Sequence, residues 1–385
     1  MRRRTRAAAL YAGSATQTST RCQRCGGCFI NRALPDQKVA AYFNQSRTTT
    51  AAAAAATAVR ARGGAAAAAA AGPLRPQMAL QFPGRPVIVQ CTYISWCACF
   101  GTLARLYTDS INPSNLALQG SFLSNSLGSF ALGALVASDL DEESMPGLYT
   151  GLTVGLCGSY TTYSGWNLRI ARAALRDAPG PGGAIVAIVA IVKSLAFFAA
   201  CFVAGRDLVK GLASRGRRLR WQGNGLGSNN ASSLGRAMGP IGAVYALLAV
   251  LLVVDDSRTR RIRWLACMFA PFGALVRFSL SRQYNNRWRE GAFPVGTFLA
   301  NVCGSLIMGI VYYGARQKDM AGWSGIALAA FQGGFLGSLT TMSSFVSEVV
   351  GHREKHSPAV SYSYLAATAI AAQVVVLVVG AALGD

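Results

Sequence analysis

The amino-acid sequence predicts an all-α integral membrane protein whose nine transmembrane helices form two inverted four-helix repeats joined by a linker helix. Hydrophobic residues make up 52% of the 385 residues and charged residues only 14%, whereas about a quarter of the residues are charged in soluble proteins. Nine apolar runs reach the roughly 20 residues that a helix needs to cross a bilayer. Three sequence blocks also recur in the same order in the two halves of the chain.

Residues 1–86 predict a disordered basic leader that is rich in alanine and carries 13 of the 37 basic residues and one acid, Asp36. This composition is typical of an organellar transit peptide and equally of a low-complexity cytosolic leader, so both interpretations remain open. The net charge of +22 does not predict a nucleic-acid partner, because most other basic residues flank apolar runs, as loop charges of membrane proteins do. Cys22, Cys25 and Cys28 have the spacing of zinc ligands, but no fourth ligand lies nearby in the sequence, which argues against a zinc site.

The spans are rich in Gly, Ala and Ser, which allow helices to pack closely in lipid. They are expected at 87–107, 119–137, 147–168, 183–205, 238–254, 262–281, 294–314, 322–350 and 359–383. The first repeat then covers 87–205, a linker with one extra helix covers 206–261, and the second repeat covers 262–385. The basic run 206–220 predicts attraction to anionic lipid beside the fourth span.

The internal repeat rests on three collinear blocks whose offsets drift only from 172 to 179. Glycines, polar residues and an arginine recur at matching positions in the blocks 100–105 and 272–277, 121–133 and 297–309, and 155–164 and 334–345. Four helices per repeat would leave both repeats in the same orientation, so the extra helix 238–254 turns the second repeat upside down. Inverted repeats are an architecture of transport proteins, with the ion path at their interface. Basic residues in the loops are nearly balanced, and the leader favours an N-terminus on the inside.

Three pairs of repeated residues could carry chemistry. The Gly-x-x-Thr-Thr run of each third span predicts a helix break, which presents backbone oxygens to a cation or is a kink filled by hydroxyl groups. Asn125 and Asn301 offer uncharged donors to an anion or make a packing hydrogen bond. Arg105 and Arg277 would attract anions at a pore mouth or extend to the membrane interface.

These motifs resemble the fluoride channels and exporters of the Fluc/FEX type, specifically the fused two-repeat eukaryotic exporters, over residues 90–383. The resemblance implies a passive fluoride channel for detoxification that works as a monomer. It implies a fluoride path along Asn125 and Asn301, with Ser121 and Thr297 one turn earlier. Hydroxyl residues after the glycines join this path: Thr162, Ser164, Thr341 and Ser343. The resemblance also implies a structural Na⁺ bound by backbone carbonyls, here those of Gly158, Thr161, Gly337 and Thr340.

The sequence departs from this family at the aromatic positions of the pores. Two phenylalanines per repeat line the pores in the family, where positive ring edges attract the anion. The corresponding residues here are Tyr163 and Trp166 in the first repeat and Met342 and Phe345 in the second. If each pore takes one residue from each repeat, Tyr163 pairs with Phe345 and Trp166 with Met342. Mid-span Lys193 contrasts with Thr368 of the second repeat, which predicts one conducting pore and one vestigial pore with Lys193 as its fixed charge.

Other functions find less support in the sequence. In HREKH at 352–356 an arginine stands where a zinc protease needs its glutamate, and no nucleophile with a base occurs in the spans, so we expect no enzyme. A secondary transporter would need acidic coupling residues, which are almost absent from the spans; it and a non-conducting membrane protein remain the alternatives. We expect the plasma membrane, or an organellar membrane if the leader is a transit peptide.

Overall fold

The computed structural model describes residues 85–111, 120–138, 140, 145–177, 180–215, 231–288, 291–316 and 322–383. All regular structure in these ranges is helical. The leader to residue 84 lies outside the described residues, as do Cys22, Cys25, Cys28 and part of the predicted linker. Within the described ranges, five helices are long and apolar enough to cross a membrane by length and composition, and two shorter apolar helices, Phe122–Val136 and Ile241–Val254, accompany them.

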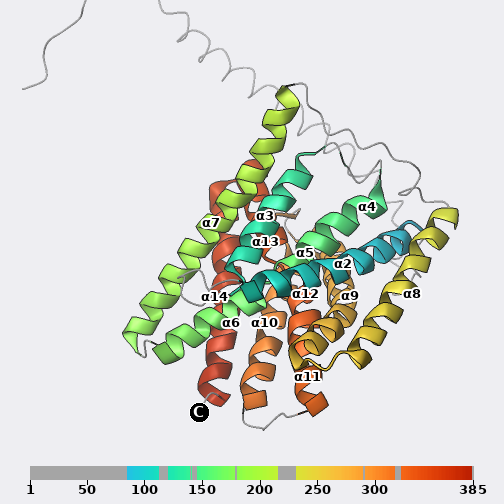
Figure 1. Ribbon diagram of the computed structural model, residues 1–385. Helices are drawn as coiled ribbons and strands as arrows, with labels where there is room; N and C mark the ends of the chain where they lie inside the picture. The colour runs from blue at the N-terminus through green and yellow to red at the C-terminus, as the bar shows by residue number, and fades with distance from the viewer. Residues whose placement is uncertain are drawn as a thin grey trace, which may run out of the picture. The chain divides into compact units, whose positions relative to one another are not determined.

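The described helices follow the predicted order of nine spans (Figure 1). The first repeat contains α2 (Arg85–Ile111), α3 (Phe122–Val136), a broken third segment of α4 (Pro146–Thr150), η1 (Gly151–Cys157), α5 (Gly158–Tyr160), α6 (Ser164–Arg172) and η2 (Ala173–Asp177), and α7 (Pro181–Ser214). The second contains α9 (Arg258–Tyr284), α10 (Val295–Arg316), a broken segment of α11 (Gly322–Phe331), η4 (Gln332–Leu336), α12 (Gly337–Leu339) and α13 (Met342–Lys355), and α14 (Pro358–Leu383). α8 (Ala231–Val254) lies between the repeats. Because five spans precede α9, the second repeat enters the membrane from the opposite side.

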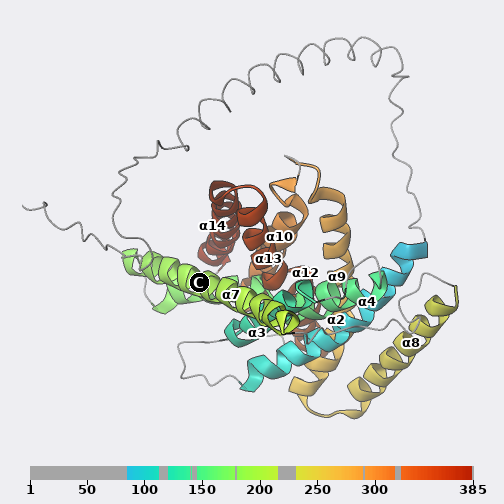
Figure 2. The same cartoon turned by 90° about the horizontal axis from the view of Figure 1, so that it is seen from above.

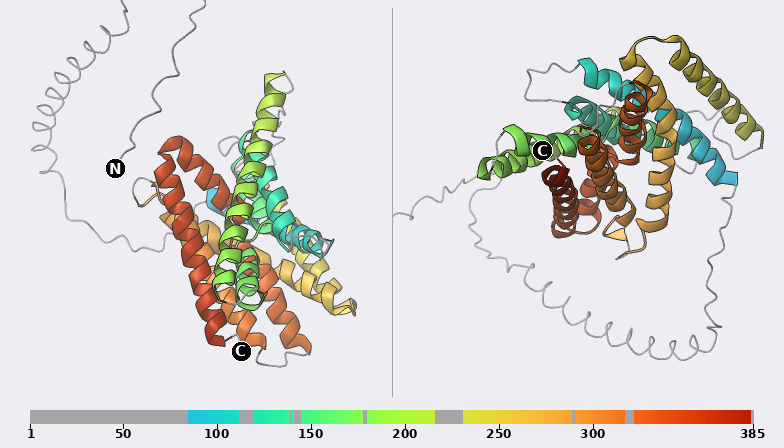
Figure 3. Two further views of the ribbon diagram at one scale, coloured as in Figure 1. Left: turned by 90° about the vertical axis from the view of Figure 1, so that its left-hand side faces the viewer. Right: turned by 90° about the horizontal axis from the view of Figure 1, so that it is seen from below.

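The helices pack in matching sets within the two repeats. α3 packs against α7, and α10 packs against α14; the latter two run side by side near the C-terminus in Figure 3. α8 packs on α2 and α9 at the edge of the bundle, as Figure 2 shows from above. α7 continues nine residues beyond the predicted end at residue 205, to Ser214, because no proline follows and Arg, Leu and Lys favour helix.

Both third segments break where the sequence predicts. Thr161 and Thr340 leave the helix with extended ψ angles of 155° and 147°, and Thr341 is extended as well. Each break is preceded by a stretch of π-helix, a wider turn that often occurs at functional positions. The two breaks are therefore built alike, as the repeat predicts.

Glycines allow the first helix of each repeat to lie directly on its broken helix. A Cβ at Gly273 would lie 2.1 Å from the carbonyl oxygen of Phe335, and one at Gly101 would lie 2.4 Å from that of Leu156. Such distances require the two backbones to separate, so only glycine fits at these crossings.

We expect Gly273→Ala to lower the free energy of unfolding by about 1–3 kcal/mol through overpacking. Gly211→Ala on α7 is the matched control, since nothing lies within 4 Å of its added Cβ, and alanine there should leave stability unchanged or raise it. Thermal midpoints of the two purified variants measure the difference. Equal midpoints would contradict the close crossing of α9 and η4.

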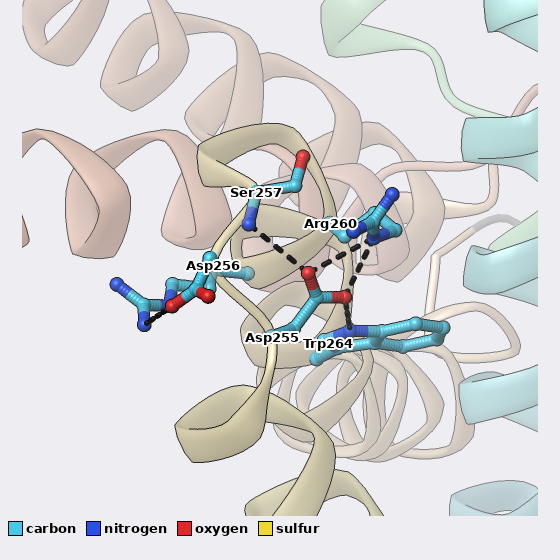
Figure 4. A network of polar contacts seen from close by, with 6 residues as sticks. Asp255, Asp256, Ser257, Arg260 and Trp264 are labelled. Atoms are coloured by element: carbon cyan, nitrogen blue, oxygen red, sulfur yellow. Dashed lines mark hydrogen bonds and ion pairs between the residues drawn. The ribbon is translucent and has the colours of Figure 1, made fainter.

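The inverting helix α8 joins α9 through residues 255–257, and Asp255 organises this connection (Figure 4). Its carboxylate accepts hydrogen bonds from the backbone N–H of Ser257 (3.0 Å), Nε of Arg260 (2.7 Å) and Nε1 of Trp264 (3.1 Å). The bond from Arg260 holds the pKa of this carboxyl well below its usual range. The carboxylate also lies at the N-terminus of α9, where negative charge is favourable. Asp255 thus fixes the connection between the inverting helix α8 and the first helix of the second repeat.

Candidate functional site

The two helix breaks meet through their hydroxyl side chains. Thr161 Oγ1 lies 3.1 Å from Ser343 Oγ, and Thr162 Oγ1 lies 3.3 Å from Thr340 Oγ1. Ser164 Oγ also lies 2.9 Å from Thr340 Oγ1. These side chains are buried. The contacts are reciprocal between the repeats, as at a two-fold axis, so the structure brings the predicted hydroxyl residues of both breaks to one crossing.

The repeated asparagines hold the breaks in place. The amide of Asn125 donates to the carbonyl of Thr162 (3.0 Å) and accepts from its N–H (2.9 Å). Asn301 makes the same pair of bonds with Thr341, at 3.2 and 2.9 Å. Both asparagines are fully buried. A packing role, left open by the sequence, is therefore present in both repeats.

The backbone carbonyls predicted to hold a cation are released from helical bonding. In a continuous helix the N–H of residue i+4 bonds to the carbonyl of residue i. The N–H groups four residues after Gly158 and Gly337 bond instead to Asn125 and Asn301. Those four residues after Thr161 and Thr340 bond to the hydroxyls of Thr162 and Thr341. Carbonyl oxygens are the ligands that hard cations prefer, so this donor set fits Na⁺.

Arg105 and Arg277 lie inside the protein, not at an exposed mouth; each is 2% exposed. Arg277 donates to the carbonyls of Ser338 (3.0 Å) and Val154 (2.9 Å), and Arg105 donates to that of Gly333. Each guanidinium also lies against the glycine of the opposite break, because a Cβ at Gly158 would lie 2.3 Å from Arg277 Nη2. The first helices of the two repeats pack against each other, so each arginine reaches the broken helix of the other repeat.

A column of aromatic rings runs beside the crossing. Tyr163 and Phe345, predicted to share a pore, have ring centroids 5.5 Å apart and ring planes at 88°. Phe345 continues edge-on to Tyr364 of α14 at 5.3 Å. The other predicted pair differs, because Trp166 packs against Tyr163 and against Phe198 of α7, at 6.4 Å, and Met342 lies in the same apolar cluster.

In each repeat an acid accepts hydrogen bonds from a hydroxyl residue at the start of the second helix. Asp109 of α2 accepts from Ser124 at 2.8 Å and from Ser121 at 3.4 Å. In the second repeat Glu348 of α13 accepts from Thr297 (2.6 Å), Asn285 (3.1 Å) and Tyr364 (2.6 Å). The sequence did not predict a role for Glu348, Asn285, Tyr364 or Asp109. Glu348 could have been found, because an acid inside the apolar run 322–350 is itself a signal of function.

The fourth helices differ in the character of the faces that they bury. The buried positions 187, 194, 195, 198 and 202 of α7 match 361, 368, 369, 372 and 376 of α14. By this match the inner face of α14 carries Ser361, Tyr364 and Thr368. The matching positions of α7 hold alanine, alanine and Ser194. Four residues after Ser194, α7 has Phe198 where α14 has an alanine. The Thr368 hydroxyl donates to the carbonyl of Tyr364. The buried face of α14 therefore carries more polar side chains than that of α7.

Lys193 differs from the expectation that it lies in a pore. Its side chain is exposed on the outer face of α7, next to exposed Val189 and Val192. α7 buries Ser194, Phe198 and Phe202, which share the opposite side because helix faces repeat every three to four residues. Lys193 thus contributes no charge to the crossing.

A cavity of about 200 Å³ beside the crossing is lined by residues of both repeats. It is lined by side chains that include Arg105, Asp109, Ser121, Thr162, Arg169 and Gln332. Three predicted residues, Arg105, Ser121 and Thr162, therefore share one space.

Among the described residues no group of three or more His, Cys, Asp or Glu could hold a metal ion.

The sequence model of the family described as "CrcB-like protein, Camphor Resistance (CrcB)" matches residues 92–206 and 264–381. The chain is 31% identical over 240 residues to fluoride export protein 1 of Candida albicans, covering 55% of this chain and 58% of the relative. It is 31% identical over 99 residues to fluoride-specific ion channel FluC 2 of Bacillus cereus and 36% identical over 97 residues to FluC 1 of Streptococcus pneumoniae. Each of these matches covers 77% of the relative, and 26% and 25% of this chain.

The chain spans about half the length of the curated fungal relatives that it matches, 58% for Candida albicans and 44% for Neurospora crassa. No solved structure matches the chain. The family match falls on each repeat in turn and leaves α8 between the two matched segments. This division agrees with the internal repeat found in the sequence.

Proposed function

Since the chain belongs to the CrcB-like protein family, we propose that it is a fluoride-selective ion channel that lets fluoride leave a cell passively and so detoxifies it. The observation that carries the proposal is the crossing of two broken helices, flanked by neutral hydroxyl donors and aromatic edges. Such groups bind an anion weakly enough for it to leave again. Relatives named as fluoride export proteins and fluoride-specific channels support the choice of anion.

One path is proposed to conduct, and it follows α14. Along it fluoride would pass the ring edges of Phe345 and Tyr163, beside the cluster in which the hydroxyls of Thr297 and Tyr364 donate to Glu348. Positive ring edges attract an anion without holding it. The equivalent path along α7 is proposed to be vestigial, because Phe198 packs beside Trp166 and few polar groups line the helix.

The released carbonyls of Gly158, Thr161, Gly337 and Thr340 are proposed to hold a structural Na⁺. Bound there, the ion would supply positive charge that ties the two breaks together and favours an anion nearby. Replacing Na⁺ by N-methylglucamine during purification should then lower the thermal midpoint and slow transport, and added Na⁺ should restore both. A midpoint that does not depend on Na⁺ would contradict this site.

The protein is an integral membrane protein, and we propose that it works as a monomer in the plasma membrane. Both halves of the crossing come from one chain, so no second copy is needed to complete it. The outer faces of α7 and α14 expose Ile188, Val192, Ile370 and Val378, which suits contact with lipid chains. A nucleic-acid partner is not proposed.

Expression in cells that lack their own fluoride exporters tests the proposal. The chain should restore growth in millimolar fluoride and lower the fluoride that the cells accumulate. Growth in matched chloride should not change. If cells that display the protein in their plasma membrane remain as sensitive as cells without it, fluoride export is not its function.

A further inference from the structure

The hydroxyl of Tyr163 has no hydrogen-bond partner among the described residues, although the side chain is fully buried. Three other buried or half-buried tyrosines have a partner for their hydroxyl: Tyr364 donates to Glu348, Tyr245 donates to the carbonyl of Met268, and Tyr160 lies 2.9 Å from Thr108 Oγ1. An O–H removed from water without a partner destabilises a folded protein. The position of this hydroxyl therefore calls for a physical reason.

The surroundings of Tyr163 leave its ring little freedom. Its backbone N–H donates to Thr340 Oγ1 at the crossing, and its ring packs edge-on against both Trp166 and Phe345. A residue held in this way cannot rotate its hydroxyl to another partner without breaking the aromatic column. Its hydroxyl is thus kept unpaired by the same contacts that define the conducting path.

Resting on the function proposed above, we infer that the Tyr163 hydroxyl donates a hydrogen bond to fluoride in the narrow part of the path. Fluoride is the smallest halide and the strongest hydrogen-bond acceptor among them, so one fixed O–H favours it over chloride more than ring edges alone do. An anion also supplies the missing partner of the hydroxyl. The equivalent residue of the other repeat, Met342, has no donor, which restricts this ligand to one path.

Phenylalanine at position 163 tests the hydroxyl, because Tyr163→Phe keeps the ring and its packing. We expect fluoride efflux from liposomes with the purified protein to slow about tenfold, the effect of losing about one hydrogen bond to an anion. The ratio of fluoride to chloride efflux should fall as well. The thermal midpoint should stay equal or rise, because an unpaired buried hydroxyl is removed.

Two further variants make the outcome decisive. Tyr245→Phe removes a hydroxyl of α8 that donates to the carbonyl of Met268 in α9, and the efflux of this variant should stay within about twofold of that of the unsubstituted protein. Tyr163→Met introduces the residue of the other repeat and should slow efflux more than Tyr163→Phe, because it removes the ring as well.

Normal efflux in Tyr163→Phe with slow efflux in Tyr163→Met would show that only the ring matters and would overturn the inference. A lower midpoint in Tyr163→Phe would also overturn it, since the hydroxyl would then have a structural partner. If the unsubstituted protein carries no fluoride at all, the proposed function fails, and this inference fails with it.

Discussion

Replacing Phe345 with leucine is expected to slow fluoride efflux at least about tenfold, whereas Met342→Leu should leave it within about twofold. Phe345 packs edge-on against Tyr163 and Tyr364, and leucine has no positive ring edge to attract the anion. Loss of about 1.4 kcal/mol corresponds to tenfold. Leucine keeps much of the volume at both sites, and efflux from liposomes with the purified variants measures the difference.

Phe345 and Met342 form a matched pair, because both side chains are fully buried in one apolar cluster. Both also stand where the family that the sequence resembles has phenylalanines in its pores. A general loss of packing would affect them alike. Equal loss of transport in Phe345→Leu and Met342→Leu would contradict the assignment of one conducting path along α14.

Asn125→Asp and Asn301→Asp are expected to destabilise the protein equally, by about 2–4 kcal/mol each, and to abolish transport. Aspartate keeps an acceptor for the threonine N–H but loses the donor to the threonine carbonyl, and it places a carboxylate oxygen against that carbonyl. Breaking a buried hydrogen bond in this way costs about 1–3 kcal/mol, and more when a charge is involved. Thermal midpoints of the two variants, measured by size-exclusion chromatography after heating, check the prediction.

An equal effect in the two repeats distinguishes the structural role of the asparagines, which hold the helix breaks, from a role in the fluoride path. The bonds to Thr162 and Thr341 are the same in both repeats, so both variants should unfold early, unlike the one-sided effect at Phe345. If Asn301→Asp stops fluoride while the midpoint is unchanged, the amide contacts the anion and does not hold the helix break. Loss of stability in only one repeat would contradict the equivalence of the two breaks.

Features that depend on local sequence could be predicted. The nine spans and the break at each Thr-Thr pair follow from composition, from helix propensity and from the repeat itself, whereas the pairing of Tyr163 with Phe345 follows from the family resemblance. The repeat was especially informative, because two copies of a motif that cross must bring the same residues together. Asn125 and Asn301 were found in this way, although their bonds to the backbone were only one of two interpretations.

Features that depend on the other repeat could not be predicted. Arg105 lies at the end of an apolar run and resembles a residue that extends to the interface, but its acceptor at Gly333 is 228 positions away. Lys193 was misplaced because α7 is apolar all round, so its pattern does not reveal which side faces inward. The polar face of α14 could be recognised only by comparing its buried positions with those of α7.

The most direct measurement of the central claim is ion efflux from liposomes that contain the purified chain under a potential set by K⁺ and valinomycin. A fluoride-selective electrode should record rapid release of fluoride from liposomes loaded with fluoride. Liposomes loaded with chloride should retain their chloride. This result would establish a selective passive channel in a single fused chain. Fluoride that stays inside while the protein is folded, or chloride that leaves equally fast, would contradict the account.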